Sequence, residues 1–202
     1  MNAPVFPPIA TSWKRFRDRV VDHAFTVDQY HGMIAAGVIG ENHRVELLYG
    51  RVVEKVAIGP RQSGVVNFLS ALFHRYNAVD SPAVVGVQNP ITLETSEPEP
   101  DITLSRFRDD LYGRSHPTAA DVLLVVEVAE SSLADDRDYK TPLYAGEGIA
   151  EYWIVNLPER CIEVHRDPDG ESAYRERRVV AAGESVSPAS LPNWTVEVDR
   201  LT

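Results

Sequence analysis

The sequence predicts an α/β fold in which a mixed central β-sheet is flanked by helices. The first observation is the run DVLLVVEVA at residues 121–129, which is too short and too apolar to favour a surface helix. Such a run is typical of a strand that is covered on both faces. The second observation is that helical and strand-like segments alternate along the chain, which indicates that they share one core.

A chain of 202 residues is long enough for one domain with a sizeable hydrophobic core. We expect an N-terminal arm at residues 1–24, because this stretch is rich in proline and charge, and a single domain at residues 25–202. Within the arm, the basic run at residues 13–19 is interpreted as solvated, with a phosphate contact as the less favoured alternative.

The first half of the domain is expected to supply two helices and a hairpin. Thr26 or Asp28 caps a helix that Gly37 ends. Residues 44–59 have the pattern of a hairpin with its turn at Tyr49 and Gly50. Residues 62–77 carry apolar side chains at helical spacing, which predicts an amphipathic helix.

The second half is expected to supply most of the sheet and one further helix, within residues 131–153, with Asp135 and Asp136 as caps. The strand EYWIVN follows, and then a hairpin whose turn is Asp-Pro-Asp-Gly at 167–170. The other predicted strands lie at residues 84–88, 91–94, 101–105, 121–127 and, as a short closing strand, within 191–198.

Composition excludes some classes of protein. The chain has 30 acidic against 20 basic residues and a net charge of −10, which argues against a general nucleic-acid coat protein and suits carboxylates gathered around a divalent cation. A single cysteine, Cys161, excludes an internal disulfide, and no apolar stretch is long enough to span a membrane. We therefore expect a cytoplasmic protein without a membrane partner.

Glu127 stands at the interior end of the buried run, where an ionised carboxylate is costly unless a metal ion, a lysine or a proton compensates it. If residues 101–105 pair antiparallel with residues 121–127, Asp101 lies beside Glu127. Two close carboxylates suit a hard cation such as Mg²⁺. The alternative is a strand-start aspartate beside a salt-bridged structural glutamate.

Lys140 is the third candidate in this cluster. It follows Glu127 by 13 residues, in a helix that is expected to pack back across the sheet, and it shares a helical face with Tyr144. Its ammonium group is a compact charge that suits an attacking water or a phosphate oxygen. On its own, a lysine at this position is more often a surface residue.

These residues resemble a known family. The similarity extends over roughly residues 25–200 and rests on Pro100-Asp101, EVAESS from Glu127, Asp136, Lys140, Tyr144, GIAEYW at 148–153, VELLYGRVVE at 45–54 and Gln88. In combination they resemble the Uma-two family of restriction endonucleases, within the PD-(D/E)XK nuclease superfamily.

The resemblance implies a restriction-endonuclease-like core with added hairpins. It implies that Asp101 and Glu127 bind Mg²⁺, with Mn²⁺ as a substitute, and that Lys140 is the catalytic lysine. Glu46 would be an accessory acid, or else a solvent-facing strand residue, and Gln88 an accessory residue with a structural hydrogen bond as its simpler role. The implied activity is metal-dependent hydrolysis of phosphodiester bonds in DNA.

Two departures from the family pattern keep a second reading open. Ala129 stands where the usual lysine follows the acid by two positions, and Gln62 replaces a histidine found in many relatives. The alternative is therefore a catalytically inactive nuclease fold that serves as a binding or assembly module. We also expect a homodimer, built on the EYW strand or on the C-terminal hairpin.

Overall fold

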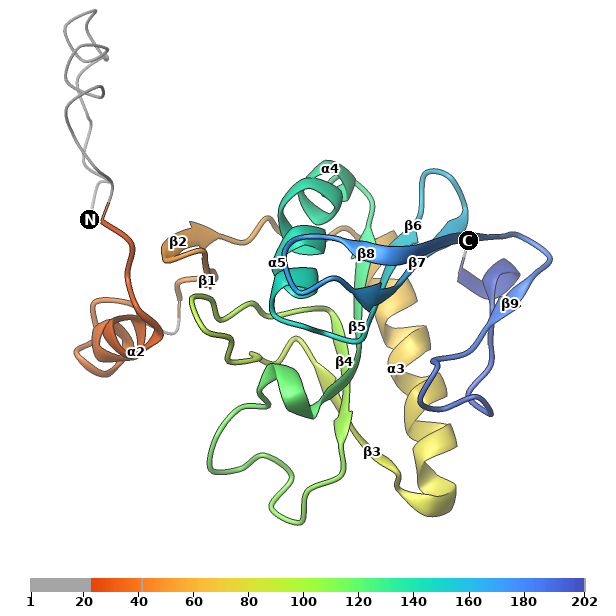
Figure 1. Cartoon of the computed structure of the whole chain (residues 1–202), viewed down its shortest axis with the longest axis horizontal. Coiled ribbons are helices and arrows are strands. Elements are labelled where there is room, and N and C mark those ends of the chain that lie inside the picture. Colours follow the sequence, from red (N-terminus) through yellow and green to blue (C-terminus); the bar gives the residue numbers. More distant parts are fainter. Residues whose placement is uncertain (1–22, 41, 202) are drawn as a thin grey trace, which may run out of the picture.

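The computed structural model describes residues 23–40 and 42–201, and a six-stranded mixed sheet runs through its centre (Figure 1). Its strand order is β3-β4-β5-β6-β7-β8. Strands β5 and β6 are parallel and the other neighbours are antiparallel, which confirms the predicted mixed sheet. The strands are β3 (Ala83–Val87), β4 (Ile102–Arg106), β5 (Val122–Ala129), β6 (Glu151–Asn156), β7 (Cys161–Pro168) and β8 (Tyr174–Ala181).

The pairing of β4 with β5 decides where the acidic residues lie. The two strands are antiparallel, as expected, and Ile102 is opposite Val126. Continuing that register by one residue sets Asp101 opposite Glu127. All eight residues of β5 are buried, as its apolar run predicts. The 3₁₀ turn η1 (Ala119–Asp121) leads into this strand.

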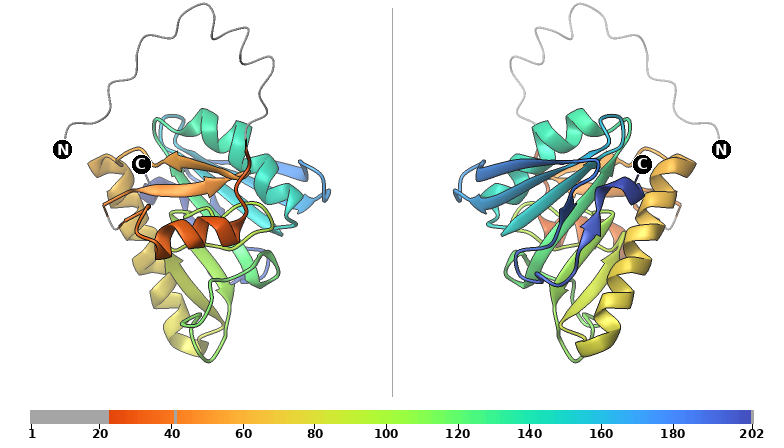
Figure 2. Two further views of the ribbon diagram at one scale, coloured as in Figure 1. Left: turned by 90° about the vertical axis from the view of Figure 1, so that its left-hand side faces the viewer. Right: turned by 90° about the vertical axis from the view of Figure 1, so that its right-hand side faces the viewer.

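One face of the sheet is covered by helix α3 (Pro60–Asp80) and by the C-terminal segment, which lie beside each other in Figure 2. The helix buries an apolar stripe that includes Leu69 and Phe73. Trp194 stacks on Phe73, with 5.9 Å between the ring centroids. The C-terminal segment contains β9 (Ser185–Val186), β10 (Val196–Glu197) and the 3₁₀ turn η3 (Val198–Leu201).

The opposite face is covered by a broken helical segment: α4 (Leu133–Asp135), the π-helical turn η2 (Asp136–Lys140) and α5 (Thr141–Gly146). Pro142 explains the break, because proline has no N–H and cannot continue the hydrogen bonding of the preceding turn. The N–H and the hydroxyl group of Thr141 both donate to the carbonyl of Asp136. The predicted single helix is thus three short pieces.

Helix α2 (Val27–Ala35) and the hairpin of β1 (Val45–Leu48) and β2 (Arg51–Glu54) stand together at one side of the sheet (Figure 2). Thr26 caps α2 through a capping box with Gln29, as predicted. Tyr49 and Gly50 form the hairpin turn at φ values of 51° and 72°. Two left-handed residues match the twist of a tight hairpin.

The structure corrects one predicted strand, and one predicted segment lies outside the described residues. Residues 91–94 do not form a strand; Thr92 makes an isolated bridge to Thr118, and Leu93 closes a turn with Ser96. Ile91 and Leu93 are apolar because this loop packs into the core. The predicted arm at residues 1–24 lies outside the described residues except for residues 23 and 24, and so does the basic run at 13–19.

No helix in residues 23–40 and 42–201 is both long and apolar enough to cross a membrane.

Candidate active site

A cleft of about 560 Å³ opens between the β1–β2 hairpin and the ends of β4 and β5. The segment from Ser131 to Lys140, which contains α4 and η2, contributes residues to its other wall. The predicted site residues all line this cleft: Glu46, Gln88, Asp101, Glu127 and Lys140. The fold therefore gathers residues that are separated by up to 94 positions in the sequence.

Glu127 and Lys140 form a direct ion pair at the floor of the cleft. The Nζ atom of Lys140 lies 2.7 Å from Oε1 of Glu127, and the hydroxyl group of Tyr144 donates to the same oxygen at 3.1 Å. Glu127 is 4% exposed and the Lys140 side chain 14% exposed. The π turn brings Lys140 to the sheet, because it sets the lysine on the side that faces β5.

Asp101 lies beside this pair and is tied to β5. Its Oδ2 accepts the backbone N–H of Val128 at 2.9 Å, and Nε2 of Gln88 lies 3.5 Å from its Oδ1, which is a long contact. The bond to Val128 fixes Asp101 next to Glu127. Gln88 thus has the geometry of a restraint on Asp101.

Glu46 is buried and does not face solvent, although it lies on a short hairpin strand. Its Oε2 accepts the backbone N–H of Glu99 at 3.0 Å, and its Oε1 lies 4.0 Å from Nζ of Lys140. Lys55 pairs with the Glu99 carboxylate at 3.0 Å. Together these contacts fasten the hairpin to the loop that leads into Asp101.

Asp136 is a site residue that sequence reasoning took for a helix cap, and that prediction is wrong for it. Its side chain makes no cap hydrogen bond; it is 2% exposed, accepts a bond from the hydroxyl group of Ser132 at 2.8 Å and lies 3.7 Å from Nζ of Lys140. Asp135, its neighbour, also makes no cap bond. In the sequence, Asp136 precedes Lys140 by four residues, a spacing that puts two side chains on the same face of a helix and so indicates that they meet.

The cluster holds four buried carboxylates, of Glu46, Asp101, Glu127 and Asp136, around one ammonium group. Burial raises the pKa of Glu127 to about 8; Lys140 opposes the rise, while Asp136 and Asp101 add to it. Burial also raises the pKa of Asp136.

Burial alone would lower the pKa of Lys140, but the surrounding carboxylates outweigh it and raise the pKa. The ammonium group therefore stays charged. The cluster as a whole has more negative charge than Lys140 can neutralise, so it favours an additional proton or cation.

The EYW residues belong to the scaffold. Glu151 is buried and accepts bonds from the indole N–H of Trp153 at 2.7 Å and from Arg166 at 2.7 Å. It also accepts the backbone N–H of Ala189 at 2.6 Å. Tyr152 and Trp153 are fully buried and are therefore core aromatics.

Within the described ranges, no three histidine, cysteine, aspartate or glutamate residues are arranged so as to hold a metal ion among themselves. The β4–β5 pair of this mixed sheet carries two acidic residues at one end, and a lysine lies beside them. This is the layout of a restriction-endonuclease-like nuclease. The comparisons with known proteins agree with this class.

The model of the Uma2 family, described as "Putative restriction endonuclease", matches residues 27–199. The chain therefore belongs to the Uma2 family. The crystal structure of a putative nuclease belonging to DUF820 from Anabaena variabilis has a similar fold, with a TM-score of 0.68 and 13% sequence identity over 88% of this chain and 97% of that chain. No curated protein matches the sequence. Family and fold together indicate a restriction-endonuclease-like nuclease.

Proposed function

We propose that this protein is a metal-dependent endonuclease that hydrolyses phosphodiester bonds in DNA. The observation that carries the proposal is the convergence of Asp101, Glu127 and Lys140 at the floor of one cleft, in a chain whose family and fold are nuclease-like. The three residues combine two oxygen donors for a cation with one fixed positive charge.

The chemistry of the donors fits Mg²⁺, with Mn²⁺ as a substitute. All the acidic groups of the floor are carboxylates, which are the ligands that a hard cation prefers. Mg²⁺ usually keeps several waters and uses one or two carboxylates together with substrate phosphates. Asp101 and Glu127 would hold it, which agrees with the lack of any three-residue cage in the described part of the chain. A divalent cation would also offset the excess negative charge around Lys140.

When bound, Mg²⁺ polarises a phosphoryl oxygen and lowers the pKa of a bound water. The residues of the chain supply orientation and charge. The Lys140 ammonium group stabilises negative charge that develops on the phosphate during attack by water. Tyr144 and Lys140 orient the Glu127 carboxylate, and the Val128 N–H orients Asp101. No covalent intermediate with the protein is needed.

The test is cleavage of labelled DNA with Mg²⁺ or Mn²⁺ by the wild type and by Glu127→Ala. We expect the variant to lose at least about a hundredfold in rate, since it loses a metal ligand and the partner of Lys140. Glu130→Ala is the matched control, because this half-exposed glutamate pairs at 3.8 Å with Arg61 and is not one of the residues that line the cleft. Equal cleavage by the wild type and Glu127→Ala would sink the proposal.

One observation favours a second candidate, a nuclease fold that binds or assembles without cutting. Lys140 already forms an ion pair with Glu127 at 2.7 Å, and the buried Ala129 occupies the usual lysine position. In such a protein the lysine would stand in for the metal ion. Calorimetry with millimolar Mg²⁺ separates the two candidates: binding that disappears in Asp101→Ala supports the nuclease, and no binding supports the inactive module.

We further propose a homodimer. The EYW strand, β6, cannot provide the contact edge, because it is paired with β5 on one side and β7 on the other. The C-terminal hairpin remains the better candidate. Its strand β8 is an edge of the six-stranded sheet and exposes the side chain of Val179.

A further inference from the structure

The mouth of the cleft carries aromatic side chains that phosphodiester chemistry does not require. Tyr49, in the hairpin turn, is 45% exposed, and Tyr139, in the π turn, is 59% exposed. Both line the cleft, together with the exposed Val56. The hydroxyl group of Tyr49 donates to the backbone carbonyl of Tyr139 at 3.1 Å. The two rings therefore belong to opposite walls that meet at this contact.

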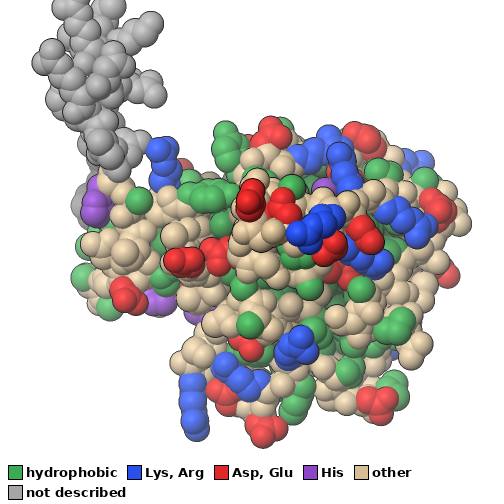
Figure 3. Space-filling view, in the orientation of Figure 1, with side chains coloured by type: hydrophobic (Ala, Val, Ile, Leu, Met, Phe, Trp, Pro, Cys, Tyr) green, Lys and Arg blue, Asp and Glu red, His purple; other side chains and the backbone are tan. Residues whose placement is uncertain are grey.

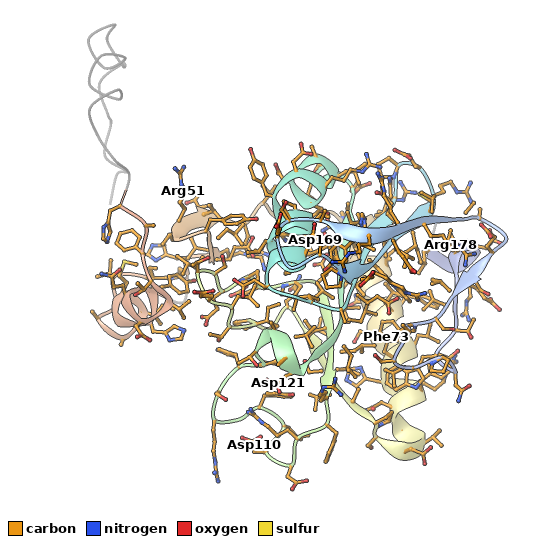
Figure 4. The ribbon with its side chains drawn as sticks, viewed as in Figure 1. Arg51, Phe73, Asp110, Asp121, Asp169 and Arg178 are labelled. Carbon is orange, nitrogen blue, oxygen red and sulfur yellow. The ribbon has the colours of Figure 1, made fainter. Side chains whose placement is uncertain are left out.

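The floor of the cleft is acidic, and its rim carries charges of both signs. Arg44 and Arg51 are exposed on the hairpin side, where Glu54 is also exposed, and Asp135 is exposed on the opposite wall. Figure 4 shows Arg51 projecting outward from the hairpin. On the face shown in Figure 3, acidic and basic side chains are interspersed and form no broad basic surface. The cations that a phosphate group could contact therefore lie on the hairpin side of the rim, beside Tyr49.

The depth of the carboxylates limits what can reach the floor. The cleft has a volume of about 560 Å³, and the contact between Tyr49 and Tyr139 joins its walls at the mouth. Glu127 and Asp101 lie at the bottom of this space and are almost completely buried. The scissile phosphate must reach these buried carboxylates, and a flexible single strand can present one phosphate to them more readily than the stiff backbone of a duplex.

From these observations we propose that the substrate enters as single-stranded DNA, as a free strand, a flap or a frayed end, with bases stacked on Tyr49 and Tyr139. The inference rests on the proposed nuclease function and names the substrate class of that site. Single-strand binding surfaces combine cations that follow the backbone with aromatic rings that stack on bases of any sequence. The tyrosines at the mouth position the strand so that one phosphate reaches Lys140.

The first measurement is binding, which is independent of cleavage. Fluorescence anisotropy compares a labelled single-stranded oligonucleotide with the blunt duplex of the same sequence, in Ca²⁺ so that a cation is present while turnover is suppressed. We expect the single strand to bind at least about tenfold more tightly, because only the strand can use the stacking surface. Equal or tighter binding of the duplex overturns the inference.

Two variants separate ring stacking from the contact between the walls. Tyr139→Ala removes a ring but keeps the backbone carbonyl that Tyr49 contacts, and it is expected to weaken single-strand binding about tenfold. Tyr49→Phe keeps the ring and removes the hydroxyl group, so it is expected to bind within about twofold of the wild type. Phe107→Ala is the control, because Phe107 is a half-exposed aromatic residue that does not line the cleft.

If Tyr139→Ala binds the single strand as tightly as the wild type does, or if Tyr49→Phe alone abolishes binding, base stacking is excluded and the inference fails.

Cleavage of the same single-stranded and duplex DNA in Mg²⁺ then tests the single-strand inference separately from the proposed nuclease activity. Cleavage of both at equal rates overturns the single-strand inference and leaves the proposed nuclease intact. Selective binding of the single strand without any cleavage supports the inference and contradicts the proposed activity. Faster cleavage of the single strand, reduced in Tyr139→Ala, supports both.

Discussion

Glu127 illustrates how one residue links the fold to the candidate chemistry. A fully buried carboxylate requires compensation, and the structure supplies a lysine ammonium group and a tyrosine hydroxyl on the same oxygen, Oε1. Burial raises its pKa to about 8; Lys140 opposes the rise, and Asp136 and Asp101 add to it. The lysine therefore compensates Glu127 only in part, which is why we propose a cation for the remaining role.

Burial raises the pKa of Glu127 but lowers that of His165, and the histidine therefore leads to a prediction about pH. Burial lowers its pKa from 6.5 to about 4; Arg177 on β8 and Arg137 in η2 lower it further, and Glu163 opposes them. Its ring lies between those of Tyr152 and Tyr174, with centroids at 5.7 Å in both cases. Its Nε2 is buried without a hydrogen-bond partner among the residues described. The folded protein therefore holds this histidine neutral.

The unfolded chain takes up a proton on His165 near pH 6.5, and the folded chain only near pH 4. This contribution to the free energy of unfolding is thus complete above pH 6.5 and is lost as the pH falls from 6.5 to 4. When the pH falls from 7.5 to 5, the free energy of unfolding in urea should decrease by about 2 kcal/mol more for the wild type than for His165→Phe, which keeps the ring stacking. Equal losses would show that His165 already titrates normally in the folded state.

At the scale of elements, the π turn η2 places Lys140 beside the sheet. A buried glutamate, Glu163, holds this turn in position. Glu163 on β7 accepts bonds from Arg137 in η2, from Arg177 on β8 at 2.7 Å and from the side-chain amide of Asn156 at 3.0 Å. Although burial opposes it, these donors lower the pKa of Glu163. The turn is thereby held against the sheet from a strand that carries no proposed catalytic residue.

Glu163→Gln tests this anchor. The substitution keeps the size of the side chain but removes its charge and replaces one acceptor oxygen by an NH₂ group that faces donors. We expect the free energy of unfolding in urea to fall by about 2 kcal/mol, less than for a fully buried pair because both arginines reach solvent.

The matched control is Asp167→Asn, which removes an exposed pair with Arg175 and is expected to stay within about 0.5 kcal/mol of the wild type. A loss for Glu163→Gln no larger than that of the control would mean that the anchor contributes little to stability.

At the scale of the whole molecule, the two faces of the sheet differ in what covers them. Helix α3 and the C-terminal segment pack one face into a largely apolar core. The broken helical segment covers the other face (Figure 1). It contributes Lys140 to the cleft, and the hairpin lines one side of that cleft. The candidate site therefore lies where three separately connected elements meet.

The net charge of −10 leads to a prediction about the proposed dimer. Two copies repel each other, and salt screens that repulsion. Light scattering should therefore show the dimer fraction rising from low to moderate ionic strength. Val179→Asp, which adds charge at the β8 edge, should reduce it. The mass of a single chain at every salt concentration would contradict the dimer.

Local patterns were sufficient to predict much of the fold. The apolar run of β5, the helix cap at Thr26 or Asp28 and the tight turn at Tyr49-Gly50 each depend on neighbours in the sequence, and the structure confirms the strand, the cap at Thr26 and the turn. Residues 91–94 have the apolar pattern of a short strand, but a buried loop has the same pattern, so the sequence does not distinguish the two. Pro142 is a local cause of the break in the helical segment, but no local pattern indicates that the turn before it is a π turn.

The sequence by itself determined that an acid would be buried at the end of a central strand, because a short, dense apolar run is typical of a strand covered on both faces. It made Asp101 the neighbour of that acid only if the two strands pair antiparallel, as the structure shows they do. Only the tertiary structure decided what surrounds that acid. It turned Asp136 from an expected cap into a member of the cluster, buried Glu46 beneath the hairpin and set Tyr49 opposite Tyr139. These contacts join residues far apart in the chain or depend on a π turn, and packing between elements, not local propensity, determines them.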